Sequence, residues 1–220
     1  MSEDNFIHEV TEELKYEQMH ALWGKYGIYV IIAVVCTVIF TGVYQVYAYM
    51  EVKKAASLGD QLLVALGLPE KSQDVALQKL SDLEHRSRGN VYSYLAEMQM
   101  ANIYASKKDD ANASKYYDMI ISDHSAPELL RNVARIKEGY LYIDSKDTID
   151  IGKLVVPCMD DENIFQPLAW EIMGLSNWRS GNVDLSRKYF NKIIQKVPEI
   201  TDIYRRAAVM LSVINASNKS

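Results

Sequence analysis

The side chains that most often do chemistry, histidine, cysteine and the carboxylates, are scattered along this sequence. The four histidines are far apart, and no two His or Cys residues have the spacing of a metal site. A single pair such as His8 and Glu12 is common by chance, and Asp160-Asp161-Glu162 is most simply a solvated loop or a helix cap. No glycine-rich phosphate loop or nucleophile motif is present. The sequence therefore predicts no enzyme, no cofactor, no metal site and no small-molecule substrate.

The negative charge of the chain is concentrated at its start. Residues 1–25 hold six carboxylates against Lys15 and Lys25, whereas residues 51–220 hold 22 Lys and Arg against 23 Asp and Glu. A nearly neutral domain lacks the concentrated basic face that nucleic acid requires, so no nucleic-acid partner is expected.

Residues 26–50 contain no charged side chain and are largely apolar. A helix of this length covers the roughly 30 Å of a bilayer core, so we predict a transmembrane helix over 26–50. A secretory signal peptide is the alternative, but the preceding 25 residues are acidic and too long for its basic leader. Cys36 falls in this segment and leaves Cys158 alone in the domain, so no internal disulfide is expected.

Small and polar residues recur at intervals of four within the predicted span. They could form a face that docks on another transmembrane helix, although such residues are common in any single span. This predicted docking face consists of Ala33, Thr37, Thr41 and Gln45.

After the span, apolar residues recur at intervals of three or four, and Gly, Pro, Asn or Asp mark the turns. This pattern predicts an all-α domain over 51–220, and sustained strand-like alternation is absent. The expected helices lie near 73–87, 91–107, 110–123, 127–145, 147–156, 166–180, 182–197 and 199–216.

Three consecutive helix pairs share a register of two small residues and one aromatic residue, which is typical of tetratricopeptide units of about 34 residues. In the middle unit, Ile151 and Val155 replace a small and an aromatic residue. The three positions are Ala101, Ala113 and Tyr117, then Gly139, Ile151 and Val155, then Gly174, Ser186 and Phe190. We predict a helical-hairpin solenoid with a degenerate opening pair over 51–88, repeats over about 94–127, 132–165 and 167–198, and a capping helix over 199–216.

The first helices of such repeats line the concave side of the array. Their lining positions are mostly apolar here, which favours a groove for hydrophobic or unfolded polypeptide with Tyr140 and Trp178 as aromatic anchors. The alternative is that neighbouring helices cover these side chains and make them ordinary core. The predicted groove consists of Leu95, Met98, Val133, Ile136, Tyr140, Ile143, Leu168, Leu175 and Trp178.

The chain resembles the YfgM-like family of ancillary Sec translocon subunits. The resemblance is carried by the amphipathic tail Phe6-Ile-His-Glu-Val-Thr-Glu-Glu-Leu14, by Ala21-Leu-Trp-Gly-Lys-Tyr-Gly27 before the span, and by Gly174-Leu-Ser-Asn-Trp-Arg-Ser-Gly181 in the last repeat. It implies a cytoplasmic tail over 1–25, one helix in the bacterial inner membrane and a periplasmic domain. The implied partners are translocon subunits, periplasmic folding factors and unfolded polypeptide.

Two functions agree with this organisation. The first is a membrane-tethered binding module that meets emerging polypeptides, translocon components or chaperones through its repeats. The second is a structural scaffold or self-association module of another bacterial inner-membrane complex.

Overall fold

The chain divides into two compact units, Met1–Ser57 and Leu58–Ser220. The computed structural model describes residues 37, 39–45, 47 and 49–217. In the first unit, the described residues are helical.

The predicted tail, residue Ala33 and much of the predicted span lie outside the described residues. Thr37, Thr41 and Gln45 are exposed, and the Thr41 hydroxyl donates a hydrogen bond of 2.7 Å to the Thr37 carbonyl oxygen. Among the residues described, no helix is both long enough and apolar enough to cross a membrane.

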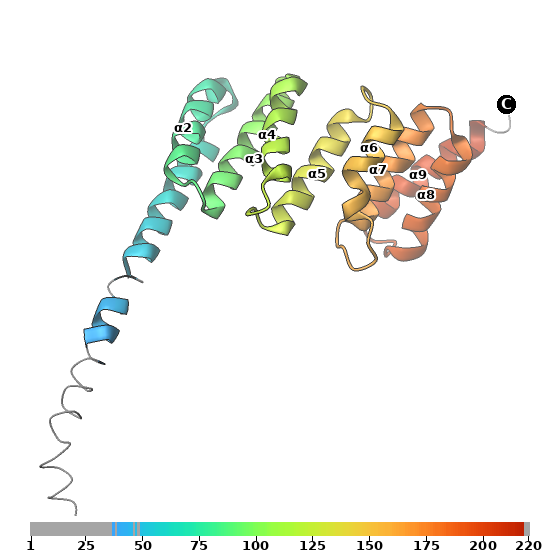
Figure 1. Ribbon diagram of the computed structural model, residues 1–220. Coiled ribbons are helices and arrows are strands. Elements are labelled where there is room, and N and C mark those ends of the chain that lie inside the picture. Colours follow the sequence, from blue (N-terminus) through green and yellow to red (C-terminus); the bar gives the residue numbers. More distant parts are fainter. Residues whose placement is uncertain (1–36, 38, 46, 48, 218–220) are drawn as a thin grey trace, which may run out of the picture. The chain divides into compact units, whose positions relative to one another are not determined.

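The second unit is built of helices that follow one another as antiparallel neighbours (Figure 1). Residues 58–66 are helical and precede the short 3₁₀ helix η1. No strand occurs between residues 58 and 217, so this part of the chain is all-α as predicted. The labelled elements are η1 (Glu70–Ser72), α2 (Gln73–Arg86), α3 (Val91–Ser106), α4 (Asp110–Ser122), α5 (Glu128–Tyr142), α6 (Thr148–Val155), η2 (Val156–Cys158), α7 (Gln166–Arg179), α8 (Val183–Lys196) and α9 (Asp202–Ser217).

Local sequence signals explain where several helices begin. The Asn90 side chain accepts a hydrogen bond of 3.3 Å from the Tyr92 amide at the start of α3, and Asp109 accepts one of 3.2 Å from the Asn112 amide at the start of α4. Such caps satisfy amides that have no partner within the helix. Gly89, between α2 and α3, has a φ of 76°, which a glycine adopts without steric cost.

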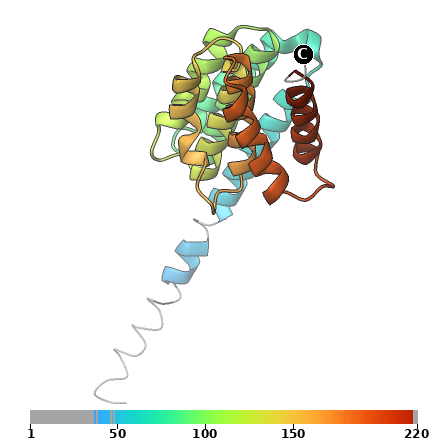
Figure 2. The ribbon, with the colours of Figure 1, turned by 90° about the vertical axis from the view of Figure 1, so that its right-hand side faces the viewer.

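Four clusters of buried side chains form the core of the second unit, and each is shared by successive helices. The first joins residues 58–66, α2 and α3, and the second joins α3, α4 and α5. The third joins α5, α6, η2 and α7, and the fourth joins α7, α8 and α9. Figure 2 shows α9, in dark red, beside α8 at the carboxyl end. Because each cluster is shared between neighbours, the predicted solenoid organisation is confirmed.

Helices α7 and α8 approach each other closely at Gly174. A Cβ atom added to Gly174 would lie 2.8 Å from Cζ of Phe190, whose ring is fully buried. On the same helix pair, the Ser186 hydroxyl donates a hydrogen bond of 2.8 Å to the Gly174 carbonyl oxygen. The small residues identified in the sequence therefore allow the Phe190 ring to fill the space between these helices.

We predict that Gly174→Ala destabilises the second unit by about 1–3 kcal/mol, because the added methyl group overpacks the core against Phe190. Gly152→Ala is the matched control, since its Cβ would meet no atom closer than 3.6 Å. That control should be neutral or stabilising by up to about 1 kcal/mol through helix propensity. Urea unfolding measures both changes, and equal effects would contradict the role of Gly174.

Candidate protein-interaction surface

A chain of hydrogen bonds joins α5, α7 and α9. The Tyr140 hydroxyl donates to Oε2 of Glu171 at 2.5 Å. From the other side, Arg206 donates through Nε to Oε1 at 2.6 Å and through Nη2 to Oε2 at 2.7 Å. We call these three residues the polar ladder. The Glu171 carboxylate is thus held by a bidentate guanidinium and by one phenol, the geometry of a strong charge-assisted pair.

The two ends of the ion pair differ in burial. The Glu171 side chain is 4% exposed and the Arg206 side chain is 51% exposed. Hydrogen bonding to Glu171 raises the pKa of Arg206, while burial and the hydrogen bond to Glu171 raise the pKa of Tyr140. The phenol therefore remains a donor and the guanidinium remains charged. Arg206 presents its exposed side to solvent while it neutralises a buried carboxylate.

The structure divides the predicted groove residues between core and partly buried positions. Met98 and Ile136 are 7% and 5% exposed, so these two belong to the core and are not available as contact residues. The other seven, which are neither buried nor fully exposed, are Leu95, Val133, Tyr140, Ile143, Leu168, Leu175 and Trp178.

These seven residues do not lie in one cluster. Tyr140, Ile143 and Leu168 pack against the third core cluster, whereas Leu175 and Trp178 pack against the fourth. Two shallow depressions of about 450 and 550 Å³ lie on α8 and α4, and neither is lined by a predicted groove residue. The seven predicted residues are therefore half-buried positions divided among separate clusters, and neither depression is lined by any of them.

Arg206 was not among the predicted site residues. The sequence contains a signal for it, because Arg206 follows Glu171 by 35 residues, which is close to one repeat length. Treating 199–216 only as a capping helix concealed this register. In the structure α9 contributes to the same polar ladder as the first helices α5 and α7.

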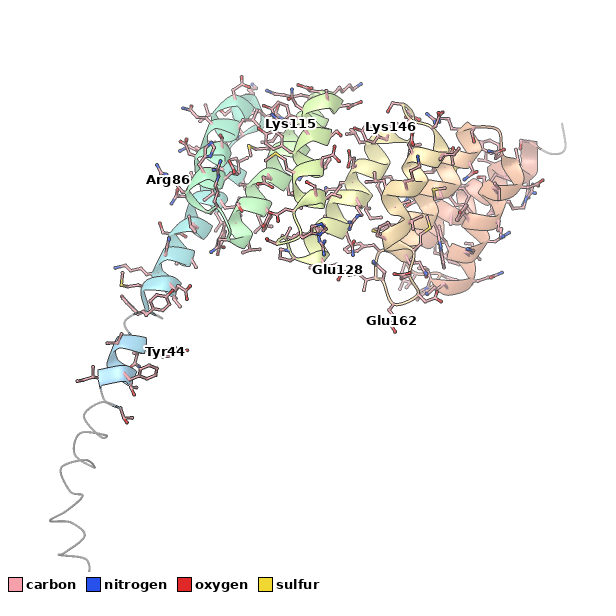
Figure 3. All side chains as sticks on the ribbon, viewed as in Figure 1. Tyr44, Arg86, Lys115, Glu128, Lys146 and Glu162 are labelled. Atoms are coloured by element: carbon pink, nitrogen blue, oxygen red, sulfur yellow. The ribbon has the colours of Figure 1, made fainter. Side chains whose placement is uncertain are left out.

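A second buried carboxylate is Glu138 of α5. It accepts a hydrogen bond of 2.6 Å from the Ser114 hydroxyl, which itself accepts one from the Tyr142 hydroxyl. Burial is the main cause that raises the pKa of Glu138. The Lys146 ammonium lies 3.4 Å from the centre of the Tyr142 ring, and Figure 3 shows Lys146 at the same edge of the second unit as Lys115. This network links α4 to α5 through polar side chains.

Residues 20–207 match the family described as the tetratricopeptide repeat-like domain. The chain belongs to this family. No curated protein and no solved structure matches it. Tetratricopeptide repeat-like domains are typically non-catalytic scaffolds, so the match suggests protein–protein interaction.

The cysteine and the potential metal ligands of this tetratricopeptide repeat-like domain form no reactive site among the described residues. Cys158 is fully buried, and burial raises the pKa of its thiol to about 11, so it is poorly suited to thiol chemistry. Within the described part of the chain, no group of three or more His, Cys, Asp or Glu side chains could hold a metal ion.

We predict that Arg206→Met lowers the free energy of unfolding by about 2 kcal/mol, because it leaves the Glu171 carboxylate buried without a cation. Arg205→Met is the matched control, since Arg205 is exposed and, among the described residues, its side chain pairs only with the exposed Asp202 of its own helix. That control should leave stability unchanged. In urea unfolding, Glu171→Gln combined with Arg206→Met should cost less than the sum of the single changes, and additive effects would contradict the coupling.

Proposed function

We propose that this protein is a membrane-anchored accessory factor of the Sec translocon in the bacterial inner membrane. Its helical repeats bind translocon components, periplasmic chaperones or emerging polypeptides. The tetratricopeptide repeat-like match, the uncharged stretch over 26–50 and the resemblance of the tail and last repeat to the YfgM-like family support this proposal. The tail lies in the cytoplasm, and the domain from residue 51 onward lies in the periplasm.

The observation that carries the binding role is the set of half-buried apolar and aromatic side chains contributed by the successive first helices α3, α5 and α7. Side chains of this kind anchor protein interfaces when a partner covers the rest of their surface. Trp178 is the largest of them and comes from the carboxyl-terminal part of α7. The guanidinium of Arg206 on α9 is partly exposed and has N–H donors beyond the two that Glu171 accepts, which suit a partner's carbonyl or carboxylate oxygens.

We predict that Trp178→Ala weakens binding of an unfolded polypeptide at least about tenfold, because it removes an aromatic anchor. Leu185→Ala on α8 is the control, since Leu185 is 49% exposed and belongs to no core cluster. Fluorescence anisotropy with a labelled, permanently unfolded polypeptide measures binding by the full chain in nanodiscs. Circular dichroism establishes that both variants keep their helices. Unchanged binding by the folded Trp178→Ala variant would contradict the proposed surface.

The proposed topology can be tested with a thiol at a described, exposed position. Ala111 of α4 is exposed, and we expect Ala111→Cys to react with a membrane-impermeant maleimide added to cells with a permeabilised outer membrane. The unsubstituted chain is the control, because the buried thiol of Cys158 should not react. Labelling of Ala111→Cys only after the inner membrane is broken would place the domain in the cytoplasm.

A scaffold that self-associates is the second candidate function. Val209 and Val213 are 61% and 43% exposed and stand one turn apart on α9, which no later described helix covers. A repeat array normally ends in a polar outer face, so this apolar pair fits contact with a further protein surface. Crosslinking separates the two functions, because a scaffold captures the same folded partner whether or not translocation is active.

A further inference from the structure

Glu97 is a carboxylate buried between the opening helices and the first repeat. It lies on α3 and is only 6% exposed. Its neighbours Ala96 and Met100 belong to the core cluster that joins residues 58–66 and α2 to α3. Among the described residues, no hydrogen bond or ion pair is formed by the Glu97 side chain. The charged form therefore has no protein donor to stabilise it, and the low exposure of the residue limits its stabilisation by water.

The charged groups that face Glu97 are also acidic. They are Glu84 from α2 and Asp123, which directly follows α4. Tyr116 of α4 is a further titratable neighbour, whose pKa is raised first by burial and also by Tyr104, Glu84 and Glu97. On α3 itself, the Tyr94 hydroxyl donates to Asp123 at 2.7 Å.

Two basic side chains of this region, Arg88 and His85, lie against Glu84. Arg88 Nε lies 3.6 Å from one Glu84 oxygen, and His85 Nδ1 lies 3.3 Å from the other. Among the described residues, Glu97 has two carboxylates as charged neighbours and forms no ion pair with a cation. Burial, then Glu84, then Asp123 raise the pKa of Glu97 to about 7 from an ordinary value of 4.5.

We propose that Glu97 makes the docking of the opening helices, residues 58–86, on α3 sensitive to pH. A neutral Glu97 fits the buried interface. An ionised Glu97 is desolvated and repelled by Glu84 across the α2–α3 contact, and the interface loosens. The bistable element is thus the opening pair, whose helix at 58–66 and helix α2 contact the repeats through Leu58, Ala65, Ala76, Leu80 and Leu83.

The direction of the pH effect follows from the pKa of Glu97 in the two states. The folded state holds the proton up to about pH 7, whereas the unfolded state releases it near 4.5. Between these values the folded state binds more protons, so stability falls as pH rises through this window and then levels off. The carboxylates whose pKa is lowered, such as Asp109 and Asp161, act in the opposite direction at more acidic pH.

The test compares the full chain in nanodiscs with Glu97→Gln, which places a neutral isostere at the same site. Between pH 5 and pH 8.5, the unfolding midpoint of the wild type should fall by about 5 °C relative to that of Glu97→Gln. Amide exchange, corrected for intrinsic pH dependence, should show the loss of protection in residues 58–86 and α3. Parallel midpoints and parallel exchange for the two proteins would overturn the proposal.

Two further variants distinguish the effect of Glu97 from the effects of other titrating groups. Glu128→Gln changes an exposed glutamate at the start of α5 and should leave the pH dependence of the wild type intact. His85→Gln removes the histidine that pairs with Glu84. In this background, the pH dependence of the unfolding midpoint should still differ between Glu97 and Gln at position 97. Carbon-13 NMR of the Glu97 carboxyl provides a direct readout, expected near pH 7, and titration near its ordinary value would overturn the proposal.

Discussion

The close approach of paired helices is the constraint on which the second unit depends. At Gly174 the α7 backbone leaves room for no side-chain atom, because the Phe190 ring occupies the space where a Cβ would lie. Ser186 secures the same contact with a hydrogen bond to the Gly174 carbonyl oxygen. In the first hairpin, Ala101 and Ala113 are both fully buried at the corresponding positions. Small residues therefore fix the spacing of the hairpins, and this spacing determines which side chains of successive first helices can meet.

Each of the first helices α3, α5 and α7 buries one glutamate, and each glutamate is accommodated differently. Glu171 has a bidentate guanidinium, and Glu138 has a serine hydroxyl. Glu97 has carboxylates as its charged neighbours. An unpaired buried charge is costly, so the ionised form of the glutamate is best stabilised at Glu171 and least stabilised at Glu97. The carboxyl-terminal interface is neutralised by Arg206, whereas burial raises the pKa of both Glu138 and Glu97, and only Glu97 of these two lacks a hydrogen-bond donor among the described residues.

The helices could be predicted from the sequence because apolar spacing, caps and turn residues are local signals. The small positions Gly174 and Ser186 also indicated the hairpin contact correctly. The functional surface was harder to predict, since lining positions were assigned from an idealised repeat. Met98 and Ile136 became core because helices of adjacent repeats cover them, which depends on how the hairpins stack. The partner of Glu171 on the terminal helix was missed for a different reason, since its spacing of 35 residues is a sequence signal that the assignment of 199–216 as a cap concealed.

The irregular middle repeat accounts for the position of the polar ladder. At Gly139 a Cβ would lie 3.0 Å from both Ile172 of α7 and Val155 of α6, so α5 contacts the next first helix directly. The adjacent residues Tyr140 and Glu171 then meet beside this apolar contact. Glycine on α5 thus brings two first helices together, and their neighbouring polar side chains form the hydrogen bond that Arg206 extends to α9. Val155, which departs from the regular repeat pattern, and Ile172 of the next first helix therefore act together, because both place bulk against the same glycine.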